Sequence, residues 1–246
     1  MSASYFWGIL FWILLTPTPL VVENDFLSRL VVWNVGQGQW VTWATRESCL
    51  HFDLGGEYMP AKKIKNLCAY KENKLFLSHW DWDHISFVRK MKFLVSSFCL
   101  ALRPAGTSSS FKMKIVDEIP TCDSSFESIS NLWTNSKARN SNDRSHVLVV
   151  KNKILIPGDS TLQQEKYWHR NPSVEPISIL VLGHHGSRTS TSEELLNATS
   201  HLKMAIASAR HKRYGHPHVE VVLRLKKNQV PLLKTEDWGN IWINTP

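Results

Sequence analysis

Residues 75–84 decide the fold, and they read Leu75-Phe76-Leu77-Ser78-His79-Trp80-Asp81-Trp82-Asp83-His84. The apolar run at the start of this stretch is typical of a buried strand. The residues past its end are then delivered together to one edge of a sheet, where α/β proteins build their sites. Two imidazoles and two carboxylates within six positions suit divalent metals that accept nitrogen and oxygen ligands, such as zinc or manganese.

The spacing within this stretch favours a metal site over a simple turn. On an extended segment the side chains of His79 and Asp81 point the same way. Asp83 and His84 follow the bend, where they can face a second metal ion about 3.5 to 4 Å from the first, as two-metal sites require. The alternative is a strand-to-helix turn in which an Asp caps the following helix. We predict all four residues as metal ligands, and Asp83 also as a catalytic residue.

The composition is that of a globular protein of 246 residues, with 43% hydrophobic and 20% charged side chains. This length allows one large domain or two small ones, and we expect one. The formal net charge of +8 and the pI of about 9.4 predict a mild attraction to polyanions.

The four cysteines, Cys49, Cys68, Cys99 and Cys122, contain no CxxC pair, which excludes a zinc ribbon or a thioredoxin-type motif. They can pair in three ways. One or two disulfides are compatible with an exported domain, and buried free thiols are equally compatible with the sequence.

Residues 1–28 form a hydrophobic N-terminal segment, uncharged from Tyr5 to Val22. About 20 apolar residues are needed to span a bilayer. We interpret the segment as an uncleaved anchor or the last part of a transmembrane helix, with a signal peptide or an ordinary apolar segment as alternatives. We therefore expect one domain over 29–246 that is membrane-anchored or exported.

The first part of this domain has the order of an α/β sandwich. Short strands are predicted over 30–35, 40–45 and 49–54, followed by a helix over 60–69, the strand that ends before His79, a helix to about Lys92 and a strand over 95–102. Asp53 lies at the end of the third strand, where it can orient a metal ligand; the alternative is a turn cap. The Ser-rich region 103–142 is predicted as loops and edge strands that cross the mouth of the site.

Strands of the second part also end in polar residues. A hairpin over 146–157 delivers Asp159, which can bridge two metals, although Gly-Asp is also an ordinary turn. A strand over 177–182 delivers His184 and His185. One of them binds metal or donates a proton, and the other packs or contacts substrate. The sequence does not decide between them; we assign His184 to the metal and His185 to catalysis.

Residues that can bind phosphate follow these ligands along the chain. Ser187 offers a hydroxyl and an amide to a phosphate oxygen. A strand over 204–208 delivers a basic run, which we interpret as substrate-binding, with a solvated surface as the alternative. His216 is predicted as catalytic, with a ligand, phosphate-contact or helix-start role left open. The predicted substrate contacts of this run are Arg210, Lys212, Arg213 and Tyr214.

These motifs, in this order, resemble the metallo-β-lactamase superfamily, and within it the hydrolase domain of ComEC-type DNA-uptake proteins. The resemblance rests on Val35-Gly36-Gln37-Gly38, Asp53-Leu54-Gly55-Gly56, His79 to His84, Asn142 to Leu148, Gly158-Asp159, Gly183 to Ser187 and Tyr214 to Pro217. The sequence departs from the family where Asn34 and Gln39 replace Asp and where Ser86-Phe87 replaces Gly-Gly. The middle histidine of the superfamily has no counterpart unless His146 serves.

The resemblance implies a four-layer αββα sandwich that holds one or two divalent metal ions, manganese or zinc. Asp81 in place of a histidine makes the site richer in oxygen, which raises manganese relative to zinc. The implied function is metal-dependent hydrolysis of a phosphodiester, in single-stranded DNA, alongside other competence proteins and outside the cytoplasm of a bacterium. The alternatives are a hydrolase of a small phosphoester or lactone, and a non-catalytic DNA-binding module of an uptake machine.

Overall fold

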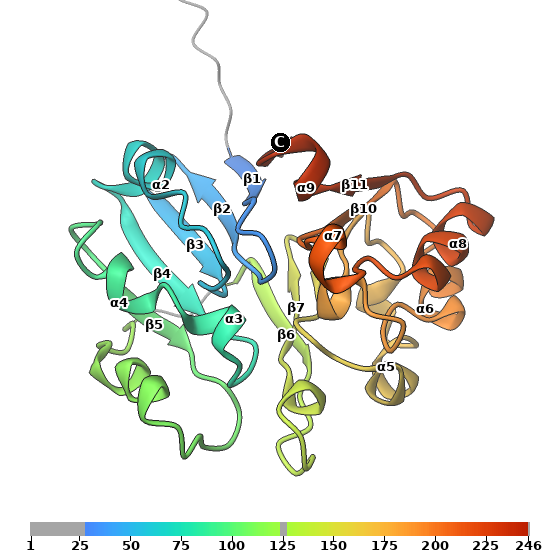
Figure 1. Cartoon of the computed structure of the whole chain (residues 1–246), viewed down its shortest axis with the longest axis horizontal. Helices are drawn as coiled ribbons and strands as arrows, with labels where there is room; N and C mark the ends of the chain where they lie inside the picture. The colour runs from blue at the N-terminus through green and yellow to red at the C-terminus, as the bar shows by residue number, and fades with distance from the viewer. Residues whose placement is uncertain (1–27, 124–126, 246) are drawn as a thin grey trace, which may run out of the picture.

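Two six-stranded sheets form the centre of the computed structural model, which describes residues 28–123 and 127–245 (Figure 1). The first sheet has the order β12-β1-β2-β3-β4-β5, with β1 (Ser28–Val32), β2 (Val41–Thr45), β3 (Ser48–Phe52), β4 (Glu72–Phe76), β5 (Cys99–Leu102) and β12 (Ile241–Thr245). The second has the order β11-β10-β9-β8-β7-β6, with β6 (Ile129–Trp133), β7 (Val147–Val150), β8 (Ile154–Ile156), β9 (Ile179–Val181), β10 (Met204–Ala207) and β11 (Leu232–Lys234).

Helices cover the outer face of each sheet. The first sheet is covered by α2 (Ala61–Cys68), α3 (Trp82–Ile85), α4 (Val88–Met91) and the 3-10 helix η1 (Phe111–Glu118). The second is covered by α5 (Leu162–Trp168), α6 (Glu193–Ala198) and α8 (Val219–Lys227). Short connecting helices are η2 (Asn142–Arg144), η3 (Pro172–Val174), η4 (Gly183–Gly186), α7 (His211–Tyr214) and α9 (Thr235–Trp238).

Alternation along the strands builds the layers. In β1, Leu30 and Val32 lie in the core between the sheets, whereas Val31 packs against the helices of the first sheet. In β7, Leu148 faces the central core and Val149 the helices of the second sheet. Three apolar cores therefore separate four layers, and the expected αββα sandwich is confirmed.

The parallel strands of both sheets end at one edge. β3, β4 and β5 are parallel in the first sheet, and β8, β9, β10 and β11 are parallel in the second. Polar segments that follow β3, β4, β8, β9 and β10 consequently gather there.

The region 103–142 differs from its prediction as loops and edge strands. β6 is an edge strand as expected, but η1 is an added helix that buries Met113, Ile115 and Val116 in the first outer core. The predicted helix that runs to Lys92 is two short helices, α3 and α4.

The structure bears on the pairing of the cysteines and on the N-terminal segment. The cysteines form two disulfides, Cys49–Cys68 and Cys99–Cys122. The predicted hydrophobic segment lies outside the described residues except for Ser28, the first residue of β1. No helix within 28–123 and 127–245 is long and apolar enough to cross a membrane.

Candidate metal centre

Asp53 is the hub of the predicted site. Its backbone has a left-handed φ of 57°, a conformation that costs energy for a residue other than glycine and that is common at functional sites. One carboxylate oxygen, Oδ2, accepts hydrogen bonds from the Ser78 hydroxyl at 2.7 Å and from Gln39 Nε2 at 2.8 Å. The same oxygen lies 2.7 Å from His84 Nδ1. Asp53 therefore fixes the ring of His84 with Nδ1 as the donor, which leaves Nε2 to face the site.

His79 is oriented by the same network. Because the Ser78 hydroxyl donates to Asp53, its oxygen accepts from His79 Nδ1 at 2.9 Å. His79 Nε2 then points toward Asp159, with 3.7 Å to Oδ2.

His185 comes from the second sheet and repeats this arrangement. Its Nδ1 donates to the carbonyl oxygen of Ser208 at 3.0 Å, and its Nε2 lies 3.3 Å from His84 Nε2 and 3.2 Å from Asp83 Oδ2. Both His184 and His185 have a left-handed backbone, with φ of 48° and 56°. The tight turn η4 thus directs one ring inward.

Asp159 receives these rings in the middle of the site. Its Oδ1 lies 3.1 Å from His84 Nε2, and its backbone N–H donates to the Ser145 hydroxyl at 3.0 Å. Gly158 precedes it with φ of 55°, and a Cβ there would lie 2.6 Å from the Cβ of Ser78, so only glycine fits this approach.

Two buried atoms at the centre have no hydrogen-bond partner of good geometry among the described residues: His79 Nε2 and Asp159 Oδ1. Buried polar atoms without a partner are rare in folded proteins. His79, His84 and Asp159 form one group whose ligand atoms lie within 4.8 Å of one another, and Asp83, His84 and His185 form a second. Nitrogen and carboxylate oxygen at this spacing fit one or two divalent metal ions.

The charges of the centre are strongly coupled. Burial lowers the pKa of His84, but the carboxylates of Asp159 and Asp53 outweigh burial and raise that pKa well above its ordinary value. Burial raises the pKa of Asp159, but the neighbouring histidines, His84 first, hold it well below its usual range. Burial also lowers the pKa of His185, yet Asp159 and Asp83 raise it overall. The site therefore favours positive charge between its carboxylates.

Asp81 and Asp83 lie at the solvent-facing side, with side chains 39% and 40% exposed. Asp81 Oδ2 is 3.5 Å from His79 Nε2, and this neighbouring imidazole is the largest cause of the lowered pKa of Asp81. Burial raises the pKa of Asp83, but the hydrogen bond with His185 and the charge of His84 lower it overall. The predicted ligands of residues 79–84 are thus brought together around Asp159.

The histidine pair occupies different positions. His184 has a side chain 27% exposed, its Nε2 lies 3.6 Å from Asp159 Oδ2, and Asn142 Nδ2 approaches that nitrogen at 3.3 Å. Burial lowers its pKa. His185 is 2% exposed and is one of the residues grouped around a possible ion. We therefore revise our assignment and propose His185 as the ligand and His184 as a residue at the rim.

His146 does not take the place of the middle histidine. Its Nε2 donates to the carbonyl oxygen of Arg103 at 2.9 Å, and its Nδ1 lies 2.6 Å from the Thr134 hydroxyl. Both ring nitrogens are thus engaged away from the centre, and burial lowers the pKa of this side chain.

His216 borders the site from the second sheet. Gln37 Nε2 lies 3.3 Å from His216 Nδ1, and the ring centroid is 6.2 Å from that of His184. Burial, followed by the charges of His185 and His184, lowers its pKa to about 4. His216 is therefore neutral at pH 7 and presents Nε2–H as a donor.

The basic run is partly neutralised. Glu57 Oε1 lies 3.1 Å from Arg210 Nη1 and 2.9 Å from Arg213 Nη1, and the Tyr214 hydroxyl approaches the same oxygen at 3.4 Å. Lys212 is exposed on α7. Of the predicted phosphate contacts, two arginines thus share one carboxylate.

Ser187 is buried, and its hydroxyl lies 3.0 Å from that of Thr189. Asp53 was predicted to orient a ligand, and it contacts His84. No role was predicted for the other residues that hold the side chains of the site in place, which are Gln37, Gln39, Glu57, Ser78, Ser145 and Ser208. Their signal was the position next to a strand end, which serine and glutamine share with many ordinary turns.

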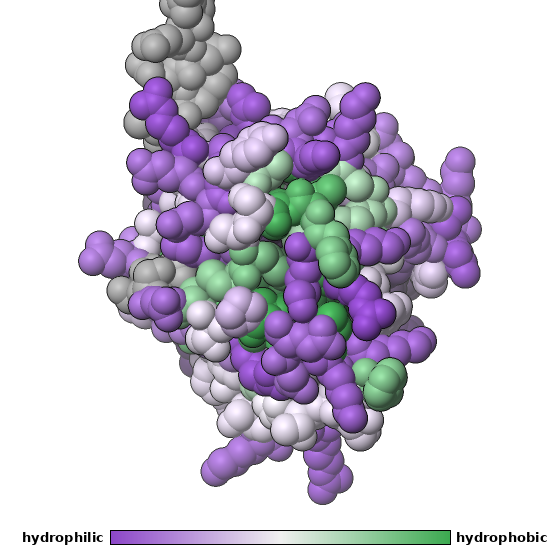
Figure 2. Space-filling view, turned by 90° about the vertical axis from the view of Figure 1, so that its left-hand side faces the viewer, coloured by the Kyte–Doolittle hydropathy of each residue, from purple (hydrophilic) through white to green (hydrophobic). Residues whose placement is uncertain are grey.

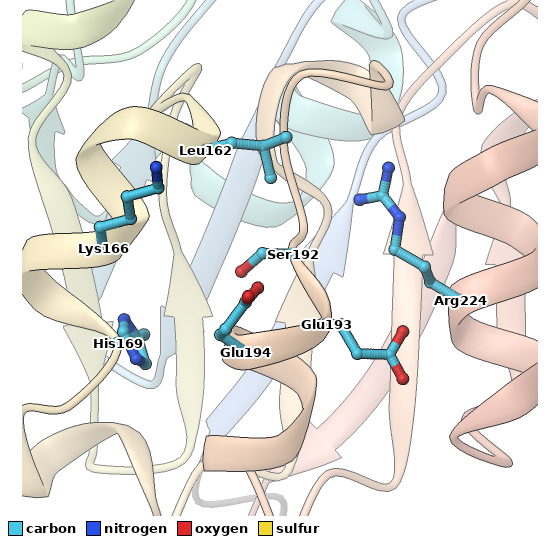
Figure 3. A pocket seen from close by; sticks show the side chains of 7 residues that line it. All are labelled: Leu162, Lys166, His169, Ser192, Glu193, Glu194 and Arg224. Carbon is cyan, nitrogen blue, oxygen red and sulfur yellow. The ribbon is translucent and has the colours of Figure 1, made fainter.

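A separate cavity of about 350 Å³ lies between α5, α6 and α8 (Figure 3). Lys166 and His169 lie across from Ser192 and Glu194, and the side chain of Glu193 extends toward the helix that carries Arg224 (Figure 3). Arg224 donates to the carbonyl oxygens of Ser190 and Thr191 at 2.9 and 2.5 Å, so it braces the loop after η4. None of the predicted ligands lines this cavity.

The fold and the site place the chain among proteins of the metallo-β-lactamase fold. The metallo-β-lactamase fold protein YhfI from Bacillus subtilis superposes with a TM-score of 0.51 at 13% identity, over 84% of this chain and 96% of that one. No family model matches the chain.

Sequence relatives are found among competence proteins. Over 42% of the present chain, the sequence is 34% identical to Recombination protein 2 of Haemophilus influenzae. Over 80% of the present chain, it is 27% identical to ComE operon protein 3 of Bacillus subtilis. It is 28% identical to Competence protein ComA of Neisseria gonorrhoeae over 88%. The matches span 13%, 27% and 32% of those three proteins. These similarities confirm the resemblance to ComEC-type competence proteins.

Proposed function

We propose that the chain is a divalent-metal-dependent phosphodiesterase that cleaves DNA in a DNA-uptake system. The observation that carries the proposal is the common orientation of His79, His84 and His185. Each uses Nδ1 on an outer partner and turns Nε2 toward Asp159. Hydrogen-bonded histidines held in this way are the usual form of metal ligands.

The residues that would hold the metal are His79, His84, His185, Asp83 and Asp159, and the carboxylate of Asp81 lies beside His79. A divalent metal supplies a Lewis acid that lowers the pKa of water and stabilises negative charge on a phosphoryl group. The half-exposed carboxylate of Asp83 is placed to orient the attacking water. Neutral His216 donates Nε2–H toward a phosphate oxygen, because Gln37 occupies its other nitrogen.

Export of the domain is part of this proposal. Two disulfides within the first half of the domain favour an oxidising compartment, where such bonds form and persist. DNA that enters a cell passes through such a compartment, and the net positive charge of +8 suits a polyanion.

A small phosphoester or lactone is the second candidate substrate. It is favoured by the pairing of Arg210 and Arg213 with Glu57, which leaves less charge for a phosphate backbone. Hydrolysis of DNA would fall steeply with salt, whereas hydrolysis of a small ester would not.

The test is hydrolysis of a single-stranded oligodeoxynucleotide with added manganese or zinc. We expect Asp83→Ala and Asp159→Ala to lose about 10³-fold or more of the wild-type rate. Asp237→Ala is the matched control, because this exposed carboxylate pairs with Lys234 away from the site. Equal rates in wild type and both site variants would contradict the proposal. Purified protein without stoichiometric metal would instead support a non-catalytic module.

A further inference from the structure

A cleft of about 250 Å³ lies beside the metal centre, between α3, α4 and η1. It belongs to the side of the molecule on which apolar side chains are interspersed with hydrophilic ones (Figure 2). The residues of this cleft that matter here are Trp82, Arg89, Phe111, Lys112, Lys114 and Glu118. We name it the α3–η1 cleft.

Two aromatic rings of the α3–η1 cleft face solvent. Trp82 is 45% exposed and Phe111 is 82% exposed, although large aromatic side chains are normally buried. Each ring has a lysine beside it: Lys112 Nζ lies 5.4 Å from the centroid of Trp82, and Lys114 Nζ lies 5.4 Å from that of Phe111. The rings are thus held next to cations and remain accessible.

The cations of the cleft are not neutralised. Among residues 28–123 and 127–245, Arg89, Lys112 and Lys114 have no carboxylate partner within ion-pair distance. The one carboxylate of the cleft, Glu118, is paired with Lys92 at 3.3 Å. This differs from the basic run, where Glu57 holds Arg210 and Arg213.

The cleft adjoins the metal centre at Trp82. Trp82 is the residue between Asp81 and Asp83, whose half-exposed carboxylates face His79 and His185. Trp80, the other tryptophan of this stretch, is buried and donates to the carbonyl oxygen of Gly106, so it packs. A chain-like ligand that lies on Trp82 would therefore need to extend by only one residue's width to meet the carboxylates of Asp81 or Asp83.

We infer that the α3–η1 cleft binds single-stranded DNA, with bases stacked on Trp82 and Phe111 and phosphates paired with Arg89, Lys112 and Lys114. Alternation of accessible rings and unpaired cations is what single strands require, whereas a duplex hides the faces of its bases. The inference rests on the proposed function because it names the path by which that substrate reaches the site.

The experiment measures binding without hydrolysis. A fluorescently labelled twelve-nucleotide oligo-dT is titrated with the full chain in EDTA, and the dissociation constant is taken from fluorescence anisotropy at several salt concentrations. Phe111→Ala is compared with Phe93→Ala, since Phe93 is 86% exposed and does not line the cleft. A double variant of the cleft, Lys112→Gln and Lys114→Gln, is compared with a control double variant, Lys62→Gln and Lys63→Gln. Lys62 and Lys63 are exposed lysines on α2.

We expect Phe111→Ala to weaken binding about five- to tenfold, and Phe93→Ala to change it less than twofold. The double variant in the cleft should lower the slope of log affinity against log salt by about 1.4, and the α2 double variant should leave it unchanged.

The inference is overturned if the wild type binds no oligonucleotide, if Phe111→Ala and Phe93→Ala bind alike, or if polyglutamate of equal charge competes as well as oligo-dT. Its failure can be told from failure of the proposed function. Binding that depends on Phe111 in a protein that cleaves no DNA supports the cleft and contradicts the nuclease. Metal-dependent cleavage by a protein whose DNA binding does not change in Phe111→Ala supports the nuclease and contradicts the cleft.

Discussion

Two fully buried histidines near the carboxyl end of β3 have opposite electrostatic surroundings. His51, within the strand, has only neutral partners: Thr42 and Trp40 at Nδ1, and Asn73 at Nε2. His84 packs at the end of the strand between the carboxylates of Asp53 and Asp159. Both side chains are 0% exposed.

The difference separates a histidine in a neutral hydrogen-bond network from the histidine that we propose as a metal ligand. Burial lowers the pKa of His51 to about 4, so its ring stays neutral and completes a closed hydrogen-bond network. The two carboxylates raise the pKa of His84 despite burial, and its Nε2 faces Asp159. Burial alone therefore does not make a histidine a candidate metal ligand, whereas burial between two carboxylates does.

Acidification should destabilise the protein through His51. A histidine with a lowered folded-state pKa contributes stability that is present above its unfolded pKa of 6.5 and is lost as the pH falls toward 4. We expect about 3 kcal/mol of unfolding free energy to depend on this group. Urea unfolding of metal-free protein between pH 7 and 4 measures it, and His51→Gln should show a shallower decline. Parallel declines in the two proteins would place the acid sensitivity elsewhere. In the same metal-free protein the contribution of His84 to the unfolding free energy has the opposite pH dependence. The pKa of His84 is raised in the folded state, so its contribution is lost as the pH rises.

Metal binding at the centre around His84 should stabilise the protein against unfolding. Manganese or zinc at about 100 times its dissociation constant should add about 2.7 kcal/mol to the unfolding free energy. Asp159→Asn should lose this gain, and His51→Gln should keep it. Thermal unfolding with and without the metal measures the shift. A gain that survives Asp159→Asn would show that the metal binds elsewhere.

Removing the charge of Asp53 should weaken metal binding without abolishing it. Asp53→Asn keeps the shape of the side chain but removes the charge that orients His84, so we expect metal affinity to fall about 10- to 100-fold. Calorimetric titration of metal-free protein measures this affinity. Asp117→Asn is the control, since this exposed carboxylate pairs with Arg103. Unchanged affinity in Asp53→Asn would remove Asp53 from the site.

The smallest effect concerns the neutral network. Thr42→Val removes a hydrogen bond to His51 and leaves Trp33 Nε1, which donates to Thr42 at 2.8 Å, without its acceptor. We expect a loss of about 1 to 2 kcal/mol in unfolding free energy and no change in metal affinity. Urea unfolding and the same calorimetric titration measure both. A loss of metal affinity would mean that the two histidine environments are coupled through β3.

Strand ends and apolar alternation were predictable from the sequence, since each strand that precedes a proposed ligand is followed by a polar cluster. η1 was missed because the serines before it, Ser108 to Ser110, hide the short apolar pattern of Met113, Ile115 and Val116. The choice between His184 and His185 was not predictable, because it depends on two left-handed backbone positions within one turn. The role of Glu57 depends on a contact across more than 150 positions of the chain.

The pairing of the first and last strands determines where further polypeptide could be attached to the domain. β12 runs antiparallel to β1, with Ser28 opposite Thr245. β1 is antiparallel to β2 and β2 to β3, so β1 points the same way as the strands whose carboxyl ends carry the ligands. Ser28 and Thr245 therefore leave the first sheet side by side at the edge opposite the metal centre. A longer polypeptide joined at these two points would hold the domain by one small area and leave the mouth of the site pointing away from the junction.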